Sequence, residues 1–95
     1  MKERLYLVSL YDIYGNLFTE KQQTYFEEYY FNNLSLSEIS ELYEVSRAAV
    51  SKTLNDIEKR LKDYETKLRI YDKFNKINML LDDKTKEKVS DILKD

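Results

Sequence analysis

The sequence predicts an all-α fold, a small helical domain with a helix-turn-helix and one long helix in its C-terminal half. Only one glycine and no proline occur in 95 residues, so little in the chain interrupts helices. Two hydroxyl residues are each followed three positions later by a glutamine or a glutamate, which is the spacing of a capping box. Apolar residues then recur at alternating spacings of four and three. With 42% apolar residues the chain can bury one modest core, so we expect a single domain over residues 1–95.

The N-terminal third of the chain predicts two helices. The first should cover about residues 3–14, with a buried side made of Leu5, Val8, Tyr11 and Ile13 or Tyr14. Gly15 follows at a position where a helix C-terminal cap needs a left-handed backbone. A capping box of Thr19 and Gln22 should start the second helix, which is rich in tyrosine and ends near Phe31.

The segment of about residues 35–54 predicts a helix-turn-helix. Ser35 and Glu38 form a second capping box, and Ser46 can cap the helix that follows the turn. Glu44 takes the turn position where glycine often supplies a positive φ, at about 1 kcal/mol of strain. The same spacing also fits two short core helices of a bundle. The residues expected to pack the two helices together are Ile39, Leu42, Val45, Val50 and Leu54.

The start of the second helix of this motif carries candidate nucleic-acid contacts. Arg47, Ser51 and Lys52 should point outward, where such a motif touches base edges and phosphates, and Ser46 can meet a phosphate at the helix N-terminus. Residues 1–45 hold three basic and eight acidic groups, whereas residues 46–76 hold nine basic and five acidic groups. This asymmetry indicates a polyanionic partner for the second helix, although a solvated face of paired charges gives the same pattern.

Nothing in the sequence ends the second helix at Leu54, so we expect a long helix over about residues 46–76. Its apolar seam is Val50, Leu54, Ile57, Leu61, Tyr64, Leu68 and Tyr71. The last four residues lie beyond the reach of a three-helix core. A second copy should therefore pair with Leu61, Tyr64, Leu68 and Tyr71 in a homodimer, or else the chain's own terminal helices cover them. A short tail helix is expected over about residues 83–94.

Composition argues against catalysis, cofactors and membranes. The chain has neither histidine nor cysteine, so it lacks the usual neutral-pH base, the thiolate nucleophile and the commonest metal ligands. One glycine cannot build a phosphate-binding loop. No segment approaches the roughly 20 apolar residues that span a bilayer, and the N-terminus does not read as a signal peptide. We therefore expect a cytoplasmic protein that is no enzyme and has no cofactor, catalytic residue, metal site or membrane partner.

Several motifs together resemble known families. The helix start TEKQ, the tyrosine-rich second helix, SLSEI and then VSR resemble region 4 of bacterial sigma factors. The fuller set of LYDIYGNLFTEKQ, YYFNNLSLSEISE, EVSRAAVSKTL and YETKLRIYDKF, over about residues 5–75, is similar to the YlxM family of small helix-turn-helix proteins. The family's association with the signal recognition particle implies a cytoplasmic accessory factor acting on the particle's RNA, its GTPase, or their complex with the receptor.

The resemblance also implies a set of contact residues and a ranking of functions. Ser46, Arg47, Ser51 and Lys52 take the nucleic-acid role, with a basic flank at Lys59, Arg60, Lys62, Lys67 and Arg69. RNA is favoured over DNA, because RNA helices are read largely by shape and phosphate and need few base-reading side chains. A dimeric DNA-binding transcription regulator and a pure protein-interaction module remain the alternatives.

Overall fold

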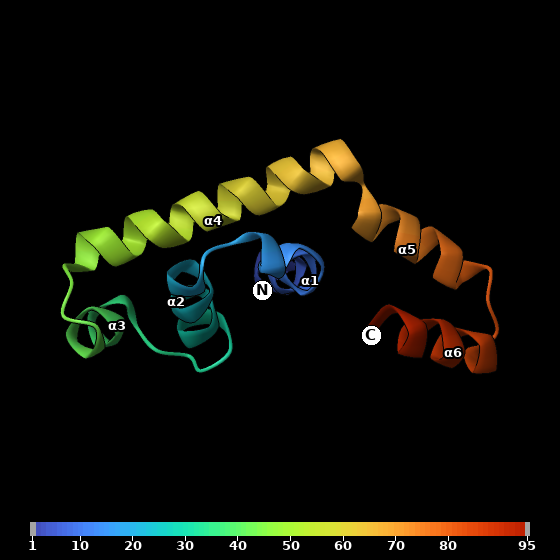
Figure 1. Ribbon diagram of the computed structural model, residues 1–95, viewed down its shortest axis with the longest axis horizontal. Coiled ribbons are helices and arrows are strands. Elements are labelled where there is room, and N and C mark those ends of the chain that lie inside the picture. The colour runs from blue at the N-terminus through green and yellow to red at the C-terminus, as the bar shows by residue number, and fades with distance from the viewer. Residues whose placement is uncertain (1, 95) are drawn as a thin grey trace.

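The computed structural model describes residues 2–94, and within that range the chain forms only helices and the loops between them (Figure 1). The described part measures 47 × 25 × 25 Å. The predicted all-α class is confirmed. In chain order the elements are α1 (Lys2–Tyr14), a 3-10 turn (Gly15–Leu17), α2 (Glu20–Tyr30), α3 (Leu36–Leu42), α4 (Arg47–Leu68), α5 (Ile70–Met79) and α6 (Asp83–Lys94).

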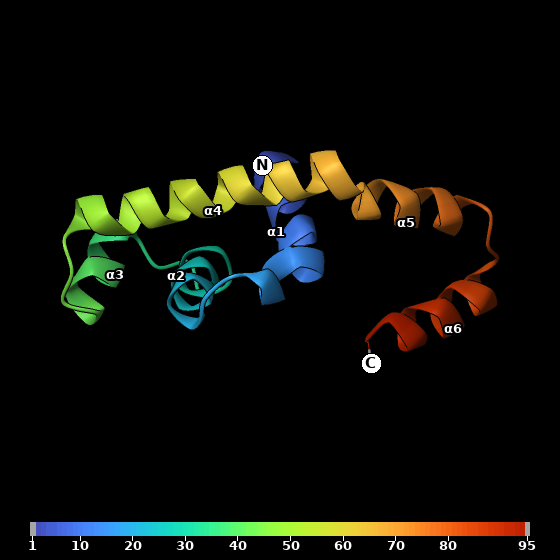
Figure 2. The same ribbon diagram turned by 45° about the horizontal axis from the view of Figure 1, so that its top comes forward.

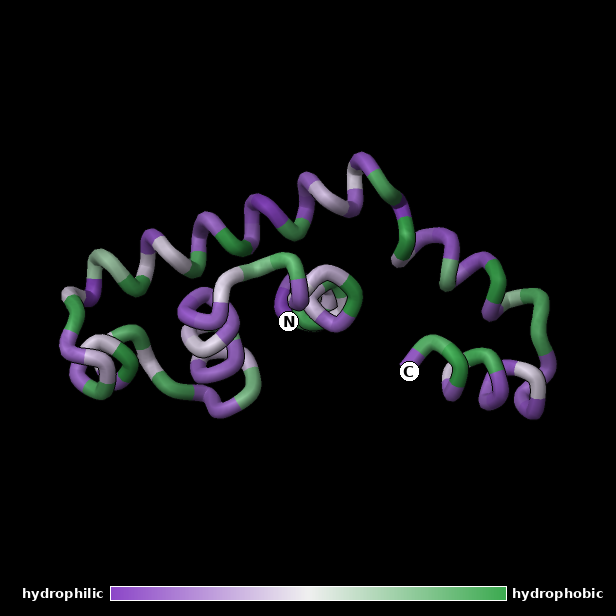
Figure 3. The backbone as a smooth tube through the Cα atoms, viewed as in Figure 1, coloured by the Kyte–Doolittle hydropathy of each residue, from purple (hydrophilic) through white to green (hydrophobic). Residues whose placement is uncertain are grey.

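One face of α4 contributes buried residues to two hydrophobic clusters. Helices α1, α2 and α3 all lie on the same side of α4 (Figures 1 and 2). Ile57 and Leu61 pack with α1 and α2 in the larger cluster, whereas Val50 and Leu54 pack with α2 and α3 in the smaller one. Hydrophobic residues recur about once per turn along α4, with polar residues between them (Figure 3). This is the amphipathic pattern that the 4–3 spacing predicts.

The helix starts follow the predicted caps. The Thr19 hydroxyl accepts a hydrogen bond from the Gln22 N–H, and the Gln22 side chain accepts one from the Thr19 N–H. Ser35 and Glu38 form the same reciprocal pair at the start of α3. The Ser46 Oγ accepts from the N–H of Ala49, 3.0 Å away, at the start of α4. Each cap satisfies an N–H that the helix itself leaves unpaired.

The predicted buried face of α1 was wrong by part of a turn. The residues of α1 in the core are Leu7, Leu10, Tyr11 and Tyr14, whereas Leu5 is 70% exposed and Val8 is half-buried. Both sets fit a helix, and they share Tyr11 and Tyr14, the second of which was one of two predicted alternatives, so only the packing against α2 and α4 distinguishes them. Gly15 is also not left-handed. A larger residue has little room at this position, because a Cβ on residue 15 would lie about 3.1 Å from the Tyr11 ring.

The long helix ends at Leu68 instead of near residue 76. Arg69 has a left-handed backbone, with φ of 54°, and α5 begins at the next residue. A buried carboxylate, that of Glu65, holds this break. It accepts hydrogen bonds from the Tyr14 hydroxyl at 2.8 Å and from the backbone N–H groups of Tyr71 and Asp72 at 3.0 and 3.1 Å. Glu65 therefore caps α5 from within α4.

Beyond the break, the tail helix α6 covers the predicted residues 83–94. The Asp82 carboxylate accepts a hydrogen bond from the Thr85 N–H at 2.7 Å, which caps the first turn of α6.

Three tyrosine–glutamate hydrogen bonds join helices in pairs, in addition to one from Tyr43, at the end of α3, to Glu28 on α2 at 2.9 Å. Tyr11 on α1 donates to Glu27 on α2 at 2.8 Å, and Tyr14 on α1 donates to Glu65 on α4. The third pair joins Tyr30 on α2 to Glu58 on α4 at 3.0 Å. Burial and the neighbouring carboxylate raise the pKa of the tyrosine in each pair.

Removing the Glu65 carboxylate should weaken the whole domain. In a Glu65→Ala variant, two backbone N–H groups and the Tyr14 hydroxyl lose their acceptor, and we expect a loss of about 2 kcal/mol or more. Urea unfolding followed by circular dichroism measures the change. Asp63→Ala, which removes an exposed carboxylate from the same helix, is the matched control. Equal effects of the two substitutions would contradict this assignment.

The tyrosine–glutamate pairs also predict alkaline behaviour. In the folded chain Tyr11, Tyr14 and Tyr30 have a raised pKa, so they hold their protons to higher pH than the unfolded chain does. Their stabilising contribution is therefore complete below a pH of about 10 and is lost as the pH rises above it. A tyrosinate absorbance titration should show a late-titrating group that joins the main transition when the chain is unfolded in urea. A single transition in the folded protein would contradict the pairs.

Candidate nucleic-acid interface

The helix-turn-helix consists of α3, the turn over residues 43–46 and the first turns of α4. Glu44 has the predicted positive φ, 55°, and the next N–H, that of Val45, bonds back to the Ser40 carbonyl at 3.0 Å. Ile39, Val50 and Leu54 are buried together with Tyr25, and Val45 packs against them. Leu42 is the exception among the predicted packing residues, because it is 58% exposed. Spacing placed it on the inner face, but α3 ends at this residue.

The start of α4 presents the four predicted contact residues in two groups. Arg47 and Ser51 are four residues apart and therefore share a face near the N-terminus of the helix. Lys52 lies about 100° farther round the helix than Ser51. Arg47 and Lys52 are exposed, Ser51 is half-buried, and the exposed Ser46 already accepts the capping bond from Ala49. The Lys52 ammonium also lies 3.6 Å from the Asp56 carboxylate, an exposed pair of small energetic weight.

Farther along α4 the basic residues differ in what they contact. Lys59 is exposed and forms no ion pair within residues 2–94. The Arg60 guanidinium instead lies over the Phe18 ring, 4.8 Å from its centroid, and donates to the Tyr64 hydroxyl at 2.7 Å. Lys62 pairs with Glu3 and Arg69 with Asp72, whereas Lys67 is exposed. Arg60 is therefore partly a packing residue, which spacing along the helix could not reveal.

The outer face of α4 includes one polar residue that the sequence analysis missed. Asn55 is exposed and lies three residues after Lys52 and four before Lys59, so the three side chains share one stripe. Asn55 could have been found from the sequence, because the i, i+3, i+7 spacing that identifies the apolar face of a helix also identifies the polar face on its other side. Lys52 and Lys59 are about 10 Å apart along the axis, and they can reach separate phosphates.

The first helix of the motif, which packs on the side of α4 opposite the stripe, is acidic. Glu41 on α3 and Glu44 in the turn are exposed, and Glu38 is exposed as well as bonded to Ser35. Hydrogen bonds from Ser35 lower the pKa of the Glu38 carboxyl, so all its charge is present at neutral pH. In a helix-turn-helix bound to duplex DNA, the first helix crosses the phosphate backbone. Here that helix would bring carboxylates toward phosphates.

Most of the seam predicted to pair with a second copy is covered within the chain. Leu61 is fully buried in the larger cluster, and Tyr64 packs against Tyr14 and Phe18. Tyr71 lies on α5 and meets the Tyr6 ring edge-on at 5.6 Å. Only Leu68, at 46%, is exposed. Helix α1 crosses the seam and covers it, which was the alternative of burial by the chain's own terminal helices.

Two other kinds of site to consider among the described residues are a metal centre and a membrane-spanning helix. Within residues 2–94 no group of three or more aspartate or glutamate side chains is placed to hold a metal ion. No helix in the same range is both long and apolar enough to cross a bilayer. The outer face of α4 offers two lysine ammonium groups and a side-chain amide, with the Asp56 carboxylate 3.6 Å from the Lys52 ammonium and the exposed Asp63 carboxylate following Lys59. Ammonium and amide groups are the kinds of side-chain group that contact phosphate oxygens in nucleic-acid complexes.

Comparison with known proteins gives a consistent result. The family described as "UPF0122: Putative helix-turn-helix protein, YlxM / p13 like" matches residues 1–94. A UPF0122 protein of Ureaplasma urealyticum is 51% identical over 78 residues, which is 82% of this chain and 79% of the relative. One from Shouchella clausii is 44% identical over 82 residues, 86% of this chain and 75% of the relative. The family description names a helix-turn-helix and no catalytic activity, and the chain belongs to this UPF0122 family of YlxM-like proteins.

Proposed function

We propose that this protein is a nucleic-acid-binding module that holds RNA phosphates on the outer face of α4. The observation that carries the proposal is the stripe of Lys52, Asn55 and Lys59, exposed on the side of α4 opposite its buried residues. Arg47 adds a cation at the first turn of the same helix. Such a surface binds through phosphates and is largely insensitive to sequence.

RNA fits this surface better than duplex DNA does. Arg47 and Lys52 are the only basic residues in the segment that would enter a DNA major groove. The carboxylates of Glu38, Glu41 and Glu44 lie where the phosphate backbone of bound DNA would pass. A structured RNA can approach α4 alone, because its recognition rests on shape and phosphates. The acidic α3 then favours RNA by disfavouring the competing polymer.

The biological setting proposed here rests on the resemblance to the YlxM family. It is that of a cytoplasmic accessory factor of the signal recognition particle, with the particle's RNA as the first candidate ligand and its GTPase as a second partner. The RNA contact requires only one copy of the chain, because Lys52, Asn55 and Lys59 come from one helix.

Removing both lysines of the stripe should weaken RNA binding at every sequence. In Lys52→Ala plus Lys59→Ala, two phosphate contacts are lost, so the slope of log affinity against log salt should fall by about 2. Titration of labelled signal recognition particle RNA and of an unrelated hairpin at several salt concentrations measures this. The matched control, Lys84→Ala plus Lys88→Ala on α6, removes equal charge elsewhere and should leave the slope unchanged. If the stripe variant binds as the original does, the protein-interaction alternative gains instead.

Reversing one acidic charge on α3 should test why DNA is disfavoured. Glu41 is exposed, so Glu41→Lys should fold normally and bind duplex DNA several-fold more tightly at low salt. Glu87→Lys on α6 is the matched control for the change in net charge.

A selection from random duplexes with the original protein should return no palindromic site. An enriched half-site repeated at about 34 Å would support the DNA-binding regulator instead.

A further inference from the structure

The C-terminal arm, defined as α5, α6 and the turn between them, exposes an unusual amount of apolar surface. Neither helix contains a buried residue. The large exposed hydrophobic residues of the arm are Ile77, Met79, Leu80, Ile92 and Leu93. Clustered exposed apolar surface of this kind marks an interaction site in a folded protein.

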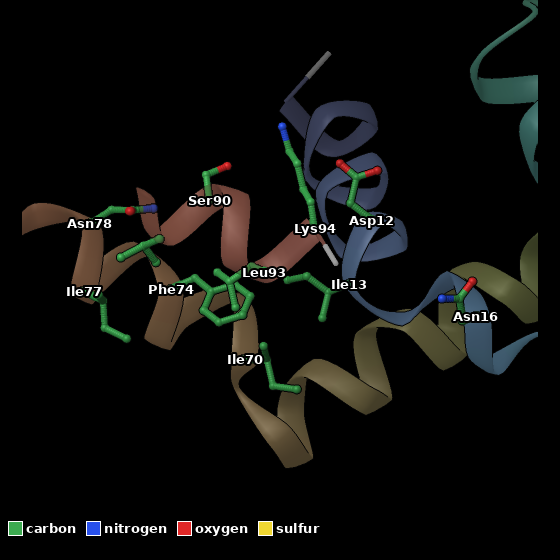
Figure 4. A pocket seen from close by; sticks show the side chains of 11 residues that line it. Asp12, Ile13, Asn16, Ile70, Phe74, Ile77, Asn78, Ser90, Leu93 and Lys94 are labelled. Carbon is green, nitrogen blue, oxygen red and sulfur yellow. The ribbon is translucent and has the colours of Figure 1, made fainter. Parts of the chain in front are cut away.

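The arm and α1 enclose an apolar groove of about 610 Å³ (Figure 4). Ile13 lines it from α1, Phe74 from α5 and Leu93 from α6. Lys94 lies at the end of the groove next to α1, near Asp12, whereas Asn78 lies at the opposite end (Figure 4). The two amphipathic helices thus turn their apolar faces toward an open space that their own side chains do not fill.

The same arm carries an apolar knob suited to such a groove. Met79, the last residue of α5, and Leu80, the first residue of the turn that follows, are 82% and 85% exposed. The turn is at the end of the arm far from α1 (Figures 1 and 2), so the knob cannot enter the α1 end of its own groove. Asp82 and Asp83 follow the knob after one intervening residue, Leu81, whereas Lys94 is at the other end of α6.

We propose that a second copy of this chain covers the groove, with two arms packed antiparallel so that each knob enters the partner's groove at its α1 end. In a twofold arrangement the knob of each chain fills the groove of the other, so both knobs and both grooves are buried. It brings Asp83 of one chain toward Lys94 of the other. It also sets the N-terminus of each α6 beside the C-terminus of its partner, which the helix dipoles favour. This interface is separate from the seam of α4, which α1 already covers.

The oligomeric state of the full chain tests the proposal. Sedimentation or light scattering should find a dimer, and Leu80→Asp should raise its dissociation constant by more than about tenfold. Leu80 is so exposed that its replacement should not disturb the monomer fold, which circular dichroism checks. The matched control is Leu5→Asp, an exposed leucine on α1 outside the groove, which should leave the dimer intact. An original protein that stays monomeric at about 100 μM would overturn the proposal and leave the groove to another protein or to closure of the arm.

A charge exchange tests the antiparallel arrangement itself. Asp83→Lys and Lys94→Glu should each weaken the dimer, because each brings like charges together, and the double variant should recover the original affinity. Both side chains are exposed, and neither belongs to the proposed RNA surface. RNA titration of the monomeric Leu80→Asp variant separates the two proposals, since the stripe on α4 remains intact. A dimer unaffected by Leu80→Asp, or single charge variants without effect, would contradict this interface.

Discussion

The apolar face of α4 is the surface on which the rest of the core depends. Ile57 and Leu61 close the cluster formed with α1 and α2, and Val50 and Leu54 close the one formed with α2 and α3. Because one rigid helix serves both clusters, the helix-turn-helix is fixed in orientation relative to α1. The opposite face of α4 must therefore point to solvent, which is what makes Lys52 and Lys59 available together. Core packing and the presentation of the proposed RNA surface have the same cause.

The tyrosines explain how so small a domain joins its helices. A phenol ring can fill a core of limited depth while its hydroxyl reaches a carboxylate at the core's edge. Tyr11, Tyr14 and Tyr30 do this between three different pairs of helices. Arg4 also joins α1 to α2, because its guanidinium donates hydrogen bonds to the Tyr29 and Tyr30 carbonyls at the end of α2. These directional contacts fix helix positions that apolar packing alone would leave variable.

What could be predicted from the sequence was mostly local, and what could not was mostly tertiary. The caps at Thr19, Ser35 and Ser46 lie within three residues of the N–H groups they satisfy, so their spacing was enough. The buried face of α1 depended on partners elsewhere in the chain. The break at Arg69 depends on Tyr14 and Glu65, which are 51 positions apart. The stacking of Arg60 on Phe18 was hidden for the same reason, so one candidate contact residue is partly occupied by packing.

The break at Arg69 also separates two surfaces that a continuous helix would have merged. In an unbroken α4, Ile77 would lie five turns after Lys59, on the same face, and Ile70 would lie only about 20° away from it. The apolar residues that line the groove would then lie on the same face as the basic stripe. One surface would have to bind phosphates and also pack against apolar side chains. The left-handed residue redirects α5 so that Ile70 and Phe74 face α1 and α6 instead. The Glu65 carboxylate that holds this turn therefore keeps the proposed RNA surface polar and the proposed dimer surface apolar.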